Sequence, residues 1–67
     1  MEWINVSSSA IRQIGYDKST QMLGIVFDGG NSGQYSGVPI DVYNEFIKAP
    51  SIGKYFNQFI KDKYSFN

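Results

Sequence analysis

Apolar residues alternate with polar or small residues along the first part of the chain, as they do in β-strands. The alternation predicts strands at residues 10–17, "AIRQIGYD", and at residues 22–28, "MLGIVFD". A shorter third strand at residues 34–38 would complete an antiparallel meander. The expected faces are Ile14 with Tyr16 on the first strand, and Leu23, Ile25 and Phe27 on the second.

The segments between these strands have the composition of turns. Residues 17–20, "DKST", are polar, and residues 28–33, "DGGNSG", hold glycines and an asparagine, which tolerate positive φ. The second segment lacks the lysine and hydroxyl residue that end a phosphate-binding loop, so we interpret it as a hairpin turn. Gly24 lies inside a predicted strand, where glycine is unfavourable, and indicates a close approach of another group to the backbone.

From Pro39 onward the apolar residues recur at helical spacing. Pro39 suits a first helical turn, Pro50 ends this helix, and Ser51 is placed to cap a second one. The apolar stripe of the first helix is Val42, Tyr43, Phe46, Ile47 and Ala49; that of the second is Ile52, Tyr55, Phe56, Phe59, Ile60 and Tyr64. Phe56, Phe59 and Ile60 are expected to be buried against the sheet.

These elements predict an α+β fold for a single domain over residues 1–67. It consists of a small three-stranded antiparallel meander, followed by two C-terminal helices packed on the sheet.

The composition excludes several classes of function. The 67 residues include no Cys and no His, so the chain lacks disulfides, the usual zinc and iron ligands, a thiol nucleophile and the commonest general base. No spacing brings two carboxylates together. We therefore expect no enzymatic activity, no metal and no cofactor. Because so short a chain buries only a small core, we expect a homo-oligomer to support it.

The chain is neutral, with six basic and six acidic side chains, unlike most proteins that bind long nucleic acids. The charges are unevenly spread, and four of the six basic residues lie in residues 43–67. This half is suited to a small anionic ligand. The chain has no apolar run long enough to cross a membrane and no apolar leader, so we expect a cytoplasmic protein without membrane contact.

One cluster has the parts of a phosphate site. Ser51 begins a helix, whose free N–H groups favour an anion, Gly53 permits close approach to the backbone, and Lys54 adds a charge. The alternative is a simple helix cap with a tight helix contact at Gly53 and a solvated lysine. Asn57 lies one turn later, where its amide would either hydrogen-bond to the edge of a base or stabilise a loop.

Further candidates are aromatic or cationic. Tyrosine hydroxyls need a partner or water, so all five tyrosines are ligand candidates, with packing in the core or at its rim as the alternative for each: Tyr16, Tyr35, Tyr43, Tyr55 and Tyr64. Arg12, the only arginine, either pairs with a carboxylate such as Asp17 or binds a phosphate across a subunit interface.

The order of "SSSAIRQIGYD", "LGIVF", "YSGVP" and "APSIGKYFNQFIKDKY" resembles the KTSC domain family over about residues 6–64. The most specific part is Pro50, Ser51, Gly53, Tyr55, Phe56, Asn57, Ile60 and Tyr64. The family has a Tyr-x-Tyr motif before a Val-Pro pair. Here Tyr35 matches the second tyrosine, but Gly33 and Ser36 stand where the family has aromatic residues. The missing bulk either removes a stacking platform or leaves room for a different ligand.

The resemblance implies a small module found alone in bacteria and phages, and at the end of some lysyl-tRNA synthetases. We carry three hypotheses. The first is a non-enzymatic module at a homo-oligomer interface that sequesters a small anionic nucleotide, such as a cyclic oligonucleotide signal of antiviral defence. The second is an accessory module that binds RNA or tRNA. The third is a protein–protein adaptor anchored by Trp3 and exposed tyrosines.

Overall fold

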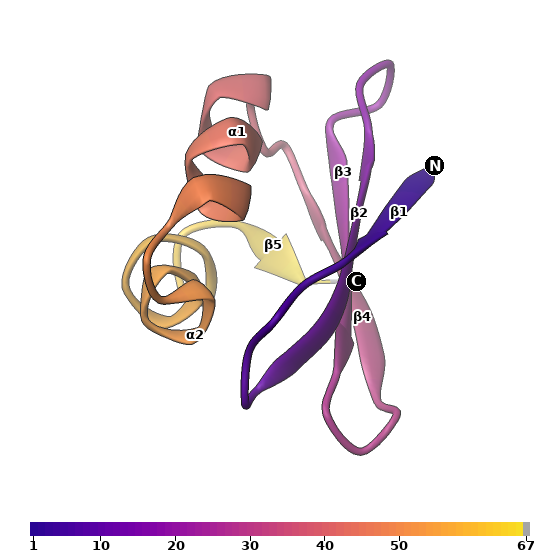
Figure 1. Ribbon diagram of the computed structural model, residues 1–67. Helices are drawn as coiled ribbons and strands as arrows, with labels where there is room; N and C mark the ends of the chain where they lie inside the picture. The colour runs from indigo at the N-terminus through magenta and orange to yellow at the C-terminus, as the bar shows by residue number, and fades with distance from the viewer. Residues whose placement is uncertain (67) are drawn as a thin grey trace.

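The computed structural model describes residues 1–66 and shows an α+β fold, in which helices cover one face of an antiparallel sheet (Figure 1). The sheet contains β1 (Glu2–Asn5), β2 (Ile11–Asp17), β3 (Met22–Phe27), β4 (Ser32–Ser36) and β5 (Ser65–Phe66) in that spatial order. The helical segments are α1 (Ile40–Lys48), α2 (Ile52–Tyr55) and the π-helix η1 (Phe56–Ile60). The expectation of two helices is confirmed, but the sheet has five strands and not three.

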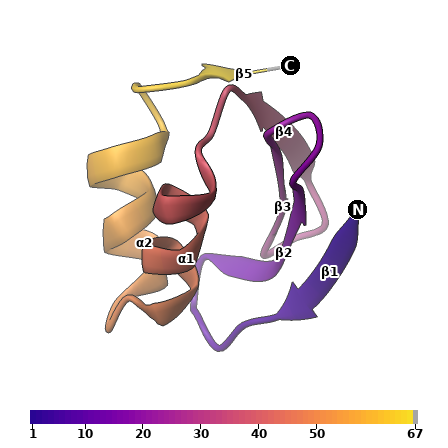
Figure 2. The same ribbon diagram turned by 90° about the horizontal axis from the view of Figure 1, so that it is seen from above.

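The three predicted strands are β2, β3 and β4, and the two additional strands lie at opposite edges of the sheet (Figure 2). β4 begins and ends two residues earlier than expected. It stops at Ser36 because Gly37 has φ 74°, a conformation that breaks the extended chain. No helix within residues 1–66 is long and apolar enough to cross a membrane.

Cross-strand pairing brings the apolar faces of the strands into one layer beneath the helices. Ile14 lies opposite Ile25, and Leu23 lies between Tyr16 and Tyr35. These residues share a buried core with the inner faces of the helices; its members are Ile11, Ile14, Tyr16, Leu23, Ile25, Tyr35, Val38, Phe46, Ile52, Phe56 and Ile60. The alternation in the sequence therefore identifies the buried face of β2 and β3 correctly.

Both helices begin where expected, but the second ends at Ile60, so Tyr64, which was expected in its apolar stripe, lies beyond it. Pro39 precedes α1 as its N-cap residue, and Ala49 closes it directly before Pro50. Ser51 caps α2, because its Oγ accepts a 3.4 Å hydrogen bond from the backbone N–H of Lys54.

The second helix then widens into a π-helix, in which the N–H of Lys61 donates to the carbonyl of Phe56, five residues earlier. Residues four apart share a face of a helix, whereas the wider π-turn rotates the residue three positions after Phe56 away from that face. Ile52, Phe56 and Ile60 thus all face the core. Phe59 is turned outward and is 51% exposed, so its expected burial is wrong.

On the face of the sheet away from the helices, Trp3 covers two glycines. A Cβ atom built on Gly15 would lie 2.7 Å from Trp3 Cδ2, and one built on Gly24 would lie 2.6 Å from Trp3 Cη2. Real Cβ atoms do not approach so closely, so both glycines make room for the indole. The close approach indicated by Gly24 is confirmed.

The end of the chain fills the space above Gly33. Phe66 pairs with Tyr35 in the sheet, and the two rings are 5.1 Å apart at 64°. A Cβ atom on Gly33 would overlap the Phe66 ring. An aromatic ring therefore covers this position, but it comes from β5 and not from a tyrosine on β4.

Candidate binding sites

A groove on the helical side of the molecule gathers three of the predicted binding residues. It has a volume of about 330 Å³ and is lined by Ala49, Pro50, Ser51, Lys54, Tyr55, Gln58 and Phe59. We call this surface the helical groove. Its lining is mainly apolar, with the Lys54 side chain exposed beside two aromatic rings.

Tyr55 is the most constrained residue of the helical groove. Its hydroxyl donates a 2.9 Å hydrogen bond to Glu45 Oε1. Its ring stacks on Phe46 at 5.6 Å and leans against Phe59 at 4.8 Å. Burial, and then the bond to and charge of Glu45, raise the pKa of Tyr55 to about 12. Tyr55 therefore stays protonated at neutral pH and holds a fixed ring behind the exposed Phe59.

The Ser51 cluster has a structural explanation. The Ser51 hydroxyl is occupied by the cap of α2, a segment of only four residues. A Cβ atom at Gly53 would make ordinary contacts, 3.7 Å from Ala10 Cβ and 3.9 Å from Ser8 Oγ, so no tight helix contact requires glycine there. The anion-binding role of Ser51 and Gly53 stays a prediction. Asn57 is exposed on η1 and does not line the helical groove.

Tyr16 and Tyr35 lie in the core and not at the surface. They are 7% and 4% exposed, and burial is the main cause that raises the pKa of each. The Tyr16 hydroxyl donates a 2.6 Å hydrogen bond to the carbonyl of Val38. Tyr35 packs edge-on against Phe56. Burial thus explains both tyrosines, and neither belongs to the helical groove.

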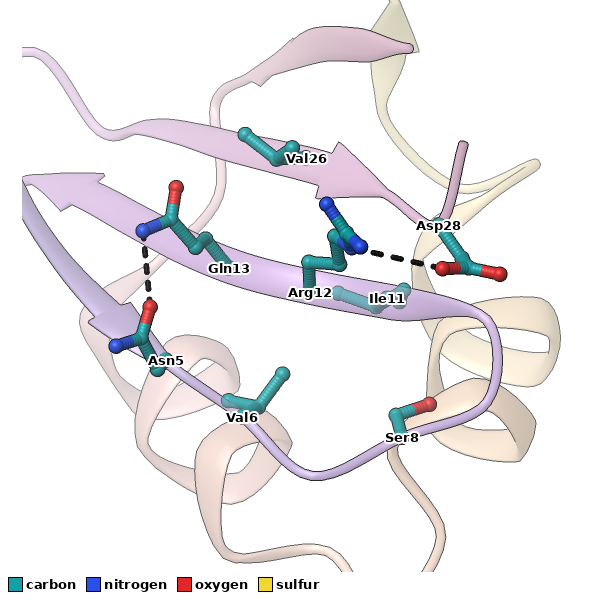
Figure 3. A pocket seen from close by; sticks show the side chains of 8 residues that line it. All are labelled: Asn5, Val6, Ser8, Ile11, Arg12, Gln13, Val26 and Asp28. Atoms are coloured by element: carbon teal, nitrogen blue, oxygen red, sulfur yellow. Dashed lines mark hydrogen bonds and ion pairs between the residues drawn. The ribbon is translucent and has the colours of Figure 1, made fainter. Parts of the chain in front are cut away.

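Arg12 lines a different cavity, on the sheet (Figure 3). A β-bulge places it there, because Ile11 pairs with Phe27 and Gln13 already pairs with Val26. Arg12 Nε lies 3.5 Å from Asp28 Oδ1, and these side chains are 66% and 63% exposed. The partner is Asp28 and not Asp17, whose carboxylate accepts hydrogen bonds from Ser19.

This Arg12 cavity has a volume of about 490 Å³. Its lining consists of Asn5, Val6, Ser8, Ile11, Arg12, Gln13, Val26 and Asp28. Figure 3 shows Gln13 reaching across to Asn5, and Gln13 Nε2 donates a 2.9 Å hydrogen bond to Asn5 Oδ1. The Arg12 cavity and the helical groove share no residue, so Arg12 and Lys54 belong to separate sites.

Within residues 1–66, no three acidic side chains come close enough together to hold a metal ion. The helical groove offers aromatic rings, the Gln58 amide and the Lys54 cation, whereas the Arg12 cavity offers the amides of Asn5 and Gln13 and the Arg12 guanidinium.

Residues 7–64 match the model of the KTSC domain, and the chain belongs to this family. The fold superimposes on the crystal structure of a KTSC domain protein from Yersinia pestis with a TM-score of 0.95 and 39% sequence identity, covering 98% of this chain and 93% of that one. A protein from Stutzerimonas stutzeri is 34% identical over 64 residues, which are 96% of this chain and 90% of the relative.

Longer relatives contain the same domain. A lysine–tRNA ligase from Nostoc punctiforme is 45% identical over 58 residues, and one from Trichormus variabilis is 41% identical over 58 residues. The match covers 87% of this chain but only 10% of each ligase. The chain thus spans about a tenth of the length of these relatives.

The structure adds two residues that the sequence reasoning did not select as ligand residues. The α-helical period places Phe59 in the core, whereas in the π-helix its side chain is turned outward. Gln58, an exposed residue of η1, also lines the helical groove. Two glycines on neighbouring strands were the available signal for a bulky side chain such as Trp3 on the outer face.

Proposed function

We propose that the protein is a non-enzymatic binding module that holds a small anionic nucleotide in the helical groove. The observation that carries this proposal is the exposed ring of Phe59, supported by Tyr55 and lying in the same groove as the Lys54 ammonium. A base stacks on an aromatic side chain with little regard to its identity, and a lysine attracts the attached phosphate.

The size of the helical groove favours sharing of the ligand between subunits. At about 330 Å³ it lies near the lower end of ligand pockets, which usually span roughly 300–1,000 Å³. A second copy of the chain would enclose the ligand from the other side. We therefore propose a homo-oligomer in the cytoplasm that sequesters a nucleotide signal, such as a cyclic oligonucleotide, without cofactor or catalysis.

Native mass spectrometry with a panel of cyclic and linear nucleotides tests this proposal, because it reports subunit number and ligand mass together. We expect an oligomer that retains a nucleotide. Lys54→Ala and Phe59→Ala should each weaken binding roughly tenfold, by loss of a charge contact or a stacking partner. Phe59 is 51% exposed, so its removal leaves the core intact.

Lys61→Ala is the matched control, since Lys61 is exposed beyond η1 and does not line the helical groove. It should bind as the unmodified protein does. A monomer that retains no member of the panel, or binding that survives both groove substitutions, would refute the proposed site.

The ligase relatives favour RNA as a second candidate ligand. Two lysine–tRNA ligases, enzymes whose names state a tRNA substrate, contain this domain. An RNA-binding module should show affinity for single strands or tRNA that falls steeply with salt concentration. Salt-independent binding, or none at low salt, would count against this candidate.

A further inference from the structure

The outer face of the sheet, away from the helices, presents a flat aromatic platform. Trp3 pairs with Gly15, which pairs with Gly24 on the next strand. The indole reaches across both, since Cβ atoms on the two glycines would meet opposite parts of its six-membered ring. The indole therefore lies on the sheet, beside the Met1 thioether that approaches the same two glycines, and Trp3 is 43% exposed.

The platform continues into the Arg12 cavity. A second cavity of about 350 Å³ is lined by Trp3, Val26, Ser32, Gly33 and Gln34. Val26 lines both cavities, so they form one surface that runs from Trp3 to Arg12. The register places Asn5, Gln13, Val26 and Ser32 side by side between the two ends. We call this continuous surface the outer track.

The chemistry of the outer track matches a nucleotide chain. The Trp3 ring offers a stacking face, and the amides of Gln13 and Gln34 can both donate to and accept from a base edge. Arg12 supplies a guanidinium, a preferred phosphate ligand. Its pair with Asp28 is weak because both side chains are exposed and the separation is 3.5 Å, so a phosphate can take the place of the carboxylate.

Other ligands fit the outer track less well. A peptide would need a deep apolar pocket for an anchoring side chain, whereas the Arg12 cavity is lined largely by polar residues. A double helix buries its base faces and attracts basic proteins, whereas this chain is neutral. Unpaired bases, by contrast, expose the π-faces that an indole on a sheet binds.

We infer that the outer track binds single-stranded nucleic acid, with a base stacked on Trp3 and a backbone phosphate at Arg12. This inference rests on the RNA-binding candidate of the proposed function, and gives it a site separate from the helical groove. Because only one arginine contributes, we expect the salt dependence to reflect about one phosphate contact at this site.

Titration with a labelled ten-nucleotide oligouridylate at low salt, followed by fluorescence anisotropy, tests the inference. Arg12→Gln should weaken binding about tenfold and reduce the slope of log K against log salt by about one. Trp3→Leu, which keeps an apolar cover over the glycines but removes the π-face, should weaken binding at least fivefold. Thermal unfolding of each variant checks that it is folded.

Lys61→Gln is the matched control and should leave oligouridylate binding unchanged, because Lys61 is exposed and lines neither the outer track nor the helical groove. If Lys54→Gln abolishes binding while both outer-track variants bind normally, the inference is overturned and the helical groove is the nucleic-acid site. Uridine monophosphate that binds as tightly as the oligomer overturns the assignment to a strand. A loss of binding confined to the outer-track variants supports it, whether or not the groove holds a small nucleotide.

Discussion

The hydroxyl of Tyr16 donates a 2.6 Å hydrogen bond to the carbonyl of Val38, 22 residues further along the chain. Both residues are buried, at 7% and 0% exposure. Val38 lies between β4 and α1, where the chain leaves the sheet to form the helices. The bond therefore ties the centre of the sheet to the point that sets the position of α1, and with it the floor under the helical groove.

Tyr16→Phe should lower the free energy of unfolding by about 1–2 kcal/mol, because it leaves a buried carbonyl without its donor. Urea denaturation followed by circular dichroism measures the loss. Tyr43→Phe is a matched control, since Tyr43 stacks on Tyr16 at 4.6 Å and the ring is retained. An equal loss in both variants would show that the hydrogen bond is not the cause.

The core of this fold could be read from the sequence because alternation and helical spacing report burial directly. Ile14, Leu23 and Ile25 were placed on one face by period alone, and all three are fully buried. β1 escaped prediction because all four of its residues are exposed, so no alternation marks it. β5 has only two residues and forms by pairing with β4, which is a tertiary event.

Only part of the candidate sites could be predicted from the sequence. Ser51, Lys54 and Tyr55 are close in sequence, so a single helix start brings them together. Phe59 depends on the π-helix, which the α-helical spacing of the apolar residues does not predict. The position of Arg12 in its cavity depends on a β-bulge, which shifts the register by one residue. The alternation of apolar and polar residues in the sequence does not reveal this bulge. Long-range geometry thus decided which candidates share a site.

Gly24→Ala should displace Trp3, because the new methyl group would lie 2.6 Å from Cη2 of the indole. Overpacking usually costs 1–3 kcal/mol, and we expect about 1 kcal/mol here because the half-exposed ring can tilt away. The emission of the single tryptophan should shift to longer wavelength as the ring enters solvent. The same substitution in a Trp3→Ala background should cost much less, and equal costs in both backgrounds would contradict the contact.

Substitutions of Ser51 separate its capping role from a role in ligand binding. Ser51→Ala should cost about 0.5–1 kcal/mol of stability, at the lower end for an N-cap because the bond is long at 3.4 Å. Ser51→Asp keeps a capping oxygen and should retain stability, measured by urea denaturation. The added negative charge beside Lys54 should nevertheless lower the affinity of the helical groove for an anionic ligand. Unchanged nucleotide affinity in this variant would place the phosphate elsewhere.

The burial of Tyr55, together with its hydrogen bond to Glu45, predicts a loss of stability at alkaline pH. The folded protein holds the pKa of Tyr55 at about 12, against an ordinary value of 10.0. Below pH 10 both the folded and the unfolded state keep the proton, so the contribution is fully present. Between about pH 10 and 12 the unfolded state releases its proton first, so stability falls as the pH rises.

Tyr55→Phe should remove this contribution while keeping the ring that supports Phe59. At neutral pH the variant should lose about 0.5 kcal/mol, the lower end for a hydrogen bond, because Glu45 is exposed. Its free energy of unfolding should then fall less steeply than that of the unmodified protein between pH 10 and 12. Tyr16, Tyr35 and Tyr43 are present in both proteins, so the difference between the two urea-denaturation profiles isolates Tyr55. Parallel profiles across this range would show that the folded state does not raise the pKa of Tyr55.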